Sequence, residues 1–264
     1  TSAQVTSEPP MLDTTSSATN HGWTATPIFT VGEAFGSYQP CGILDGIAAF
    51  KSGPNRAKVF VNHELNPGAG YAYTLTNGTQ LTGARMSTFE IERTIDSNGN
   101  VVISVANVGP GFNWVLDRGY SFVTSPAQVN QTGVAIDGLA RLCSGQGVAA
   151  GTYGFEDNIF FTGEETGTPF HPYGGSLFAL EAGRKVLYAV PAVGRGAFEN
   201  VTPLDTGDDD TIALLMGDDT ASAPLYLYVG EKRGFGSERF LDRNGLLKGK
   251  LYAWKADNGD LTPD

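Results

Sequence analysis

The sequence predicts an all-β fold of the β-propeller type, in which small sheets repeat around a central channel. The 264 residues include 35 glycines and 14 prolines, a composition typical of a chain with many turns. Short runs rich in Val, Ile, Phe and Tyr are bounded by Gly or Asn, as buried strands are. Similar strand-and-acid segments recur after about 50 residues or twice that, which is the length of a propeller blade. By this spacing the chain holds about five blades.

Two regions are expected. Residues 1–25 are polar and contain Pro9-Pro10, which predicts an extended N-terminal arm, and residues 26–264 are expected to form the propeller domain. The first strand is predicted at residues 28–31. The pair Asn98-Gly99 predicts a hairpin turn, because Asn-Gly tolerates positive φ angles. The other predicted strands lie in residues 42–50, 57–64, 84–92, 101–105, 157–165, 174–181, 186–190, 210–219, 224–229 and 249–254.

Acidic residues stand at the ends of several predicted strands. The segments 57–64, 157–165 and 210–219 end in Glu64, in Glu164-Glu165 and in Asp218-Asp219, and a looser copy ends in Glu231. Because the innermost strands of a propeller run toward one channel, we expect these acids to pool there. The sequence therefore predicts a central metal-binding channel. The alternative is that the acids are solvated turn residues, the commonest place for such pairs.

The charge balance limits the partners. The 17 basic and 28 acidic residues give a formal net charge of −11, which argues against nucleic acid or an anionic membrane surface as partner. No apolar run approaches the roughly 20 residues that a transmembrane helix needs. The Thr-, Ser- and Pro-rich first 20 residues resemble the front of a processed secreted chain. We therefore expect a secreted or periplasmic protein.

Several short motifs occur in the order found in the PhoX-type alkaline phosphatases, and over about residues 40–255 the chain resembles that family. The motifs are Asp45-Gly46, Asn62-His-Glu64, Leu142-Cys-Ser-Gly145, Gly163-Glu-Glu165, Gly174-Gly-Ser-Leu-Phe-Ala-Leu-Glu181, Gly194-Arg-Gly-Ala-Phe-Glu199, Gly217-Asp-Asp219 and Leu225-Tyr-Leu-Tyr-Val229. The resemblance implies a six-bladed propeller whose channel holds iron and calcium and binds the phosphate of a monoester. Together with the spacing, this predicts about five to six blades, complete or incomplete.

The resemblance also implies a set of site residues. The metal ligands would be Glu64, Cys143, one or both of Glu164 and Glu165, Glu199 and Asp218. A thiolate with carboxylates suits ferric iron, and carboxylate oxygens suit calcium. The metals would polarise a phosphoryl oxygen while an arginine holds the remaining oxygens. The expected substrate is a phosphorylated small molecule, and the expected activity is that of a phosphoric monoester hydrolase.

This sequence departs from the family pattern at three places. Gly163 stands where the family usually has a Cys, and Phe198 where it usually has a His. The family's downstream Arg-Pro-Glu motif, which supplies a phosphate-binding arginine, does not occur in the 264 residues. Either a further part of the same protein lies elsewhere and completes the domain as its partner, or this relative of the family lacks a complete metal site. Arg195 or Arg233 would then take the place of the missing phosphate-binding arginine. Of the two, Arg195 is the catalytic candidate.

Other interpretations remain open from the sequence. Cys143 would form a disulfide with Cys41 if it is not a metal ligand, and it cannot do both. Asp45 would be a turn former rather than a ligand. The chain as a whole would be a non-catalytic, secreted, calcium-binding propeller used for binding or assembly. A calcium-only propeller hydrolase, of the lactonase or phytase kind, is a third alternative.

Overall fold

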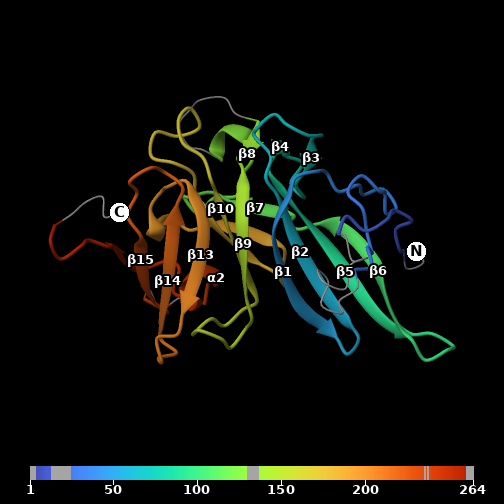
Figure 1. Ribbon diagram of the computed structural model, residues 1–264. Helices are drawn as coiled ribbons and strands as arrows, with labels where there is room; N and C mark the ends of the chain where they lie inside the picture. The colour runs from blue at the N-terminus through green and yellow to red at the C-terminus, as the bar shows by residue number, and fades with distance from the viewer. Residues whose placement is uncertain (1–3, 13–24, 130–136, 235, 237, 260–264) are drawn as a thin grey trace.

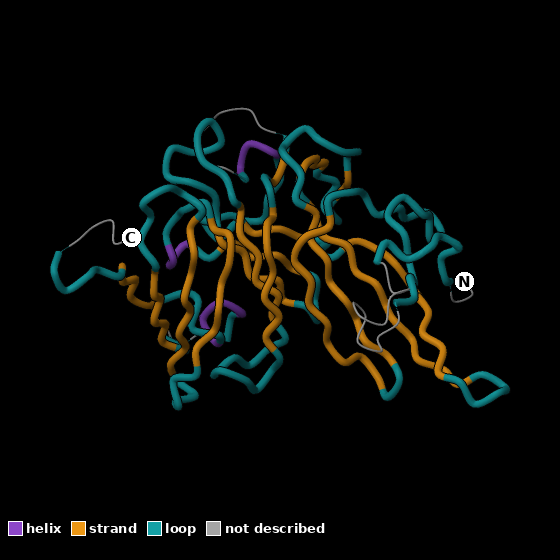
Figure 2. The backbone as a smooth tube through the Cα atoms, in the orientation of Figure 1, coloured by secondary structure: helices purple, strands orange, loops and turns teal. Residues whose placement is uncertain are grey.

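A computed structural model describes residues 4–12, 25–129, 137–234, 236 and 238–259, and this part of the chain is all-β (Figures 1 and 2). Helical structure is limited in these residues to short turns: the helix α2 (Phe240–Arg243) and the 3-10 helices η1 (Pro126–Gln128) and η2 (Pro191–Val193). The predicted all-β class is therefore confirmed.

The first large sheet has four antiparallel strands in the order β1-β2-β5-β6. The turn between β5 and β6 is the predicted Asn98-Gly99 hairpin, with Gly99 at φ 84°. Asp96 accepts the backbone N–H groups of Asn98 and Asn100 and so closes the turn. The strands are β1 (Leu44–Gly53), β2 (Arg56–His63), β5 (Arg85–Ile95) and β6 (Val101–Pro110).

The second sheet has five strands in the order β7-β12-β11-β10-β9. Its inner strand β10 is buried at every position from Ile159 to Glu164, which explains why this segment reads as one continuous apolar run. Strand β7 pairs with β12 in parallel, and the other pairs are antiparallel. The strands are β7 (Trp114–Leu116), β9 (Leu142–Val148), β10 (Ile159–Glu164), β11 (Leu177–Glu181) and β12 (Val186–Ala189).

The third sheet is a four-stranded antiparallel meander in sequence order, and a small sheet β3-β4-β8 lies apart from it. The meander is formed by β13 (Phe198–Leu204), β14 (Thr211–Asp218), β15 (Tyr226–Glu231) and β16 (Gly249–Ala253). The small sheet is formed by β3 (Tyr73–Thr74), β4 (Gln80–Gly83) and β8 (Gly138–Leu139).

The three large sheets stand side by side like a fan, with β9 in the middle sheet close to both β1 and β13 (Figure 1). Strands β1, β9 and β13 thus lie next to one another, whereas β7, which comes first in the chain in the second sheet, lies at the far edge of that sheet. None of the sheets closes on itself, and no closed ring of blades is seen among the described residues. The propeller and its five to six blades therefore remain a prediction.

Two expectations about single segments are wrong. Residues 28–31 form a loop and not a strand: Thr30 directs its backbone N–H to the carboxylate of Glu33, so it has no strand partner. Glu231 lies at the other end of the third sheet from Asp218, because β15 runs antiparallel to β14 and pairs Glu231 with Thr211 at the start of β14. The predicted arm falls largely on residues 1–3 and 13–24, which lie outside the described residues.

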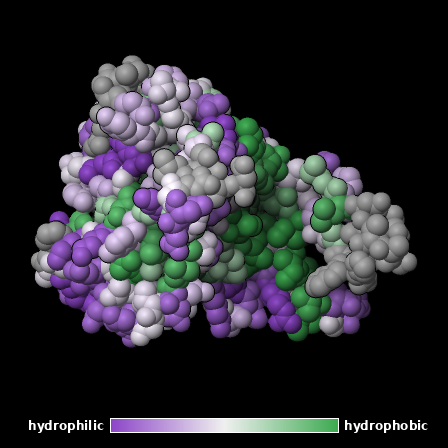
Figure 3. All heavy atoms as spheres, turned by 60° about the vertical axis from the view of Figure 1, so that its left-hand side comes forward, coloured by the Kyte–Doolittle hydropathy of each residue, from purple (hydrophilic) through white to green (hydrophobic). Residues whose placement is uncertain are grey.

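Two hydrophobic clusters fill the spaces between the sheets. One packs Phe60 of β2 with Phe160 of β10, and the other packs Phe161 with Phe198 of β13. On the face shown in Figure 3, apolar residues gather in a band between hydrophilic regions. Along β16 every residue is exposed, and Tyr252 is 49% exposed. None of the helices in the described part of the chain is long and apolar enough to cross a membrane.

Candidate metal centre

Four strand ends meet at one edge of the first two sheets. Strand β2 ends just before Glu64, and its antiparallel partner β1 begins at Leu44, opposite His63. In the second sheet β10 ends just before Glu165, and its antiparallel partner β9 begins at Leu142, opposite Glu164. Since β1 lies beside β9, these pairings bring Asp45, Glu64, Cys143 and Glu165 to the same place.

Close contact between β1 and β9 depends on Gly46. A Cβ atom at this position would overlap the backbone of Ser144 and Gly145. Without it, Asp45 reaches across: its Oδ1 accepts the backbone N–H of Ser144 at 2.7 Å, and its Oδ2 accepts the Cys143 thiol at 3.5 Å. The strands can therefore lie side by side only where one of them lacks a side chain.

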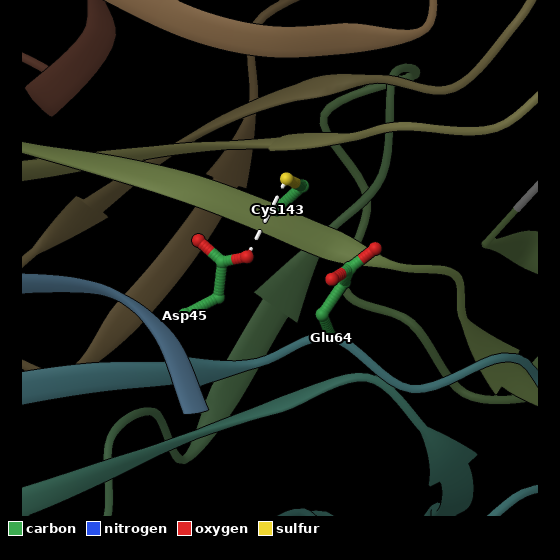
Figure 4. A group of neighbouring side chains, drawn as sticks. All are labelled: Asp45, Glu64 and Cys143. Atoms are coloured by element: carbon green, nitrogen blue, oxygen red, sulfur yellow. Dashed lines mark hydrogen bonds between the residues drawn. The ribbon is translucent and has the colours of Figure 1, made fainter. Parts of the chain in front are cut away.

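The side chains of Asp45, Glu64 and Cys143 point into one small space (Figure 4). One ligand atom from each lies within 4.8 Å of the others. Arg141 closes the group, because its Nη2 lies 2.7 Å from Glu64 Oε1 and 2.9 Å from Glu165 Oε1. We call these five residues, Asp45, Glu64, Arg141, Cys143 and Glu165, the acid cluster.

The backbone at the acid cluster is strained. Arg141 has φ 39° and Ser144 has φ 55°, both in the left-handed region that residues other than glycine rarely adopt. They flank Leu142 and Cys143, so the strained positions stand on both sides of the thiol. Non-glycine residues with such angles occur often at functional sites, where the surrounding structure maintains the strain.

Negative charge dominates the acid cluster. Burial raises the pKa of the Cys143 thiol, and the nearby carboxyl groups of Glu165, Asp45 and Glu64 raise it further. Burial also raises the pKa of Glu64, with the charges of Glu165 and Asp45 acting in the same direction and Arg141 opposing them. A bound cation would reverse these effects and favour the thiolate and carboxylates.

The donor set fits a metal ion. A thiol and three carboxyl groups converge from four strand ends, and these are ligands of iron and, through oxygen, of calcium. The present partner of two carboxylates is the Arg141 guanidinium, itself a cation. Two carboxylates of the acid cluster are therefore already paired with a positive charge.

The other residues expected from the sequence lie elsewhere. Glu164 is fully buried and turned away, with Oε1 accepting Ala140 N–H at 3.1 Å and Oε2 accepting Ser176 N–H at 3.0 Å. Glu199 is exposed and lines a narrow crevice that also contains Cys143. Arg195 donates from Nη1 to the carbonyl of Gly174 at 3.1 Å.

Asp218 is half-buried at the end of β14, outside the acid cluster. Its Oδ1 is buried and has no hydrogen-bond partner among the described residues. An unsatisfied carboxylate oxygen of this kind is costly unless water or an ion is bound there. Cys41 and Cys143 are both free thiols, so the disulfide alternative does not describe this structure.

Sequence reasoning did not assign Asp45 or Arg141 to the site. Asp45 precedes Gly46 and reads as a turn former, and its role depends on the contact between two sheets. Arg141 stands two residues before Cys143, and this proximity in sequence is the signal that would have identified it.

Comparisons with known proteins give one distant likeness. No protein-family model matches the chain, and no curated protein matches it in sequence. Among solved structures, Pseudomonas fluorescens PhoX in complex with vanadate, a transition state analogue, aligns with a TM-score of 0.49 and 17% identity. The alignment covers 83% of this chain and 46% of that protein, so this chain spans less than half of its length. The likeness extends no further than a distant structural relationship.

Proposed function

We propose that this chain is a metal-dependent phosphoric monoester hydrolase that resembles the PhoX-type alkaline phosphatases and uses iron and calcium. The observation that carries the proposal is the acid cluster, in which a thiol and three carboxyl groups from separate strand ends converge. The ordered motifs that contain Asp45, Glu64, Cys143 and Glu165 support it. The proposed substrate is a phosphorylated small molecule, and the proposed location is secreted or periplasmic.

Individual residues have distinct proposed roles. Glu64, Cys143, Glu165 and Asp45 would hold the metal, and Glu165 is favoured over Glu164, whose oxygens already accept two backbone N–H groups. When bound, the metal would supply Lewis-acid polarisation of the phosphoryl group. Further proposed ligands are Glu199, on the crevice beside Cys143, and Asp218, with its unpartnered oxygen. Arg195 is the proposed phosphate-binding residue.

The proposed architecture is a β-propeller with the acid cluster in its central channel. The three sheets would be adjacent blades, and further blades, from the remaining part of the same protein, would complete the ring. The support is the side-by-side placement of the three sheets and the exposed strand β16, whose outer edge pairs with no strand among the described residues and whose exposed Tyr252 is suited to a neighbour.

The cysteine pair offers a matched test. In the Cys143→Ser variant the acid cluster loses its sulfur, whereas Cys41→Ser alters a thiol outside the cluster. We expect purified wild type and Cys41→Ser to bind iron and calcium stoichiometrically and to hydrolyse p-nitrophenyl phosphate until chelated. Cys143→Ser is expected to lose iron and activity.

Metal-free wild-type protein that stays folded but neither binds added iron or calcium nor hydrolyses the ester would overturn the proposal. Calcium binding without iron or turnover would instead support a non-catalytic calcium-binding propeller.

A further inference from the structure

A cavity of about 460 Å³ lies between the second sheet and the segment that carries α2. Its walls come from β7 and the turn after it, from β12 and the turn before it, and from residues 238–247. The apolar and aromatic part of the wall is made by Leu116, Tyr120, Tyr188, Phe240, Leu241 and Leu247. Ligand pockets typically have volumes of about 300–1,000 Å³ and mostly hydrophobic and aromatic walls. The cavity therefore has the size and the lining of a site for a small molecule.

The aromatic wall of this cavity is held in place by its neighbours. The ring of Tyr188 stacks on that of Phe240, with the ring centroids 4.6 Å apart and an angle of 27° between the planes. The Tyr188 hydroxyl donates to Glu181 Oε2 at 3.2 Å, and Phe240 is 3% exposed. Tyr120, on the same wall, is 43% exposed. Because its rings are already fixed, the wall loses little conformational freedom when a flat apolar group packs against it.

Arg243 gives the cavity a fixed hydrogen-bond donor. Its Nε and Nη2 donate to the two Asp157 oxygens at 2.7 and 3.1 Å, and Nη2 also donates to Glu181 Oε1 at 3.0 Å. Its Nη1 donates to the carbonyl of Glu238 at 2.9 Å. A guanidinium has five N–H donors, so these four bonds leave one N–H of Nη1 for a ligand. Asp157 and Glu181 are not among the residues that line the cavity, whose described lining has three arginines and one acid, Glu238. The polar part of the lining therefore favours a negatively charged acceptor.

The cavity is separate from the acid cluster. Asp157, which binds Arg243, comes just before β10, whereas Glu165 of the acid cluster comes just after it. Strand β10 has six residues and rises about 3.3 Å per residue, so the two sites lie roughly 20 Å apart. The five residues of the acid cluster do not occur among the described residues that line the cavity.

We propose that this cavity binds a small aromatic carboxylate, with its ring against Tyr120 and Tyr188 and its carboxylate on the remaining N–H of Arg243. A guanidinium–carboxylate hydrogen bond is about twice as strong as one between neutral groups, and the ion pairs of Arg243 hold the donor in a fixed orientation. The site requires neither a metal nor the proposed hydrolysis, because it shares no residue with the acid cluster.

The test is calorimetric titration in excess chelator at neutral pH, with naphthoate and its uncharged amide, naphthamide, as probes. We expect wild type to bind naphthoate more tightly than naphthamide. Tyr120→Ala should weaken naphthoate binding by about tenfold, and Arg243→Gln by about tenfold to a hundredfold. Arg243→Gln should also remove the preference for naphthoate over the amide.

Each of these two variants has a matched control outside the cavity lining. Tyr153→Ala removes a tyrosine that is also 43% exposed and also has a positive φ, 52° against 62° for Tyr120. Arg56→Gln removes an arginine that, like Arg243, pairs with two carboxylates, those of Glu90 and Glu92 at 2.9 Å each. Both controls should bind naphthoate as wild type does.

Urea denaturation of every variant checks that it is folded. If Arg243→Gln does not fold because its ion pairs are lost, Tyr120→Ala and the comparison of the two probes still test the site. No measurable binding of naphthoate by folded wild type, or equal naphthoate affinity in wild type and folded Tyr120→Ala, would overturn the proposal. Equal affinity of wild type for naphthoate and naphthamide would overturn it as well, because the cavity would then not select a carboxylate. Because chelator is present throughout, the result is independent of whether metal-dependent hydrolysis occurs.

Discussion

Replacing Arg141 with Met removes a cation that joins the first two sheets at the acid cluster. Its Nη2 forms ion pairs of 2.7 Å with Glu64 and 2.9 Å with Glu165, and the three side chains are 40%, 19% and 13% exposed. Exposed pairs contribute about 0.2–1 kcal/mol each, and these lie toward the upper end because the carboxylates are mostly covered. We therefore expect the free energy of unfolding to fall by about 1–2 kcal/mol in chelator.

The same substitution should strengthen the response to calcium. Arg141 neutralises two carboxylates that a metal would need, so its removal relieves competition. At a calcium concentration of 100 times Kd, binding stabilises the folded state by about 2.7 kcal/mol. Urea denaturation with and without calcium measures both effects. The variant is expected to be less stable than wild type in chelator and to gain more from calcium.

Arg184→Met serves as the control, because its 3.9 Å contact to Glu181 is long and the arginine is 71% exposed. It should leave both measurements unchanged. If Arg141→Met is as stable as wild type in chelator and gains no more from calcium, the acid cluster is not the charge-balanced site described above.

Three further predictions follow from the packing and the ionisable groups. Gly46→Ala forces a Cβ atom onto the backbone of Ser144 and is expected to lower the free energy of unfolding by about 1–3 kcal/mol in urea denaturation and to reduce the stabilisation by calcium. An unchanged urea midpoint would contradict the close contact between β1 and β9. Arg243→Met leaves Asp157 and Glu181 without their shared cation and is expected to lower the free energy of unfolding by about 2–3 kcal/mol in the same assay. A loss under about 0.5 kcal/mol, which is typical of an exposed surface pair, would contradict a covered ion-pair network. Burial lowers the pKa of His63 from its usual 6.5, so on acidification the unfolded chain takes up the proton before the folded protein does. The His63 contribution to the free energy of unfolding is therefore complete above about pH 6.5 and is lost as the pH falls toward the folded-state pKa. The His63→Gln variant should show a flatter pH dependence of stability than wild type, measured in chelator.

The sequence predicted the strand-end acids because each follows a run of apolar residues that has to be buried. It could not decide between Glu164 and Glu165. Consecutive residues near a strand end point to opposite sides, and the register that selects one side depends on β9 and β11. In the structure Glu164 turns to the backbone N–H groups of Ala140 and Ser176, while Glu165 turns to Arg141.

Contacts between sheets were the second feature that could not be predicted from the sequence. Asp45 reads as a turn residue until β1 is laid beside β9, and no local pattern encodes that neighbour. Residues 28–31 show the reverse error, since an apolar run becomes a strand only when a partner offers hydrogen bonds. There the carboxylate of Glu33 takes the N–H of Thr30 instead. Local patterns therefore specify which segments are buried, and the pairing decides their structure.

Arg141 allows the acid cluster to assemble without a metal. Three carboxyl groups and a thiol brought together without a cation would repel one another or remain protonated, as the raised pKa values of Glu64 and Cys143 indicate. The guanidinium offsets part of that cost and holds the ends of β2 and β10 at a fixed separation. A metal that used the carboxylate oxygens now paired with Arg141 would have to displace the guanidinium from them. Cation affinity in this protein should accordingly be set by how strongly Arg141 is held, as well as by the ligands.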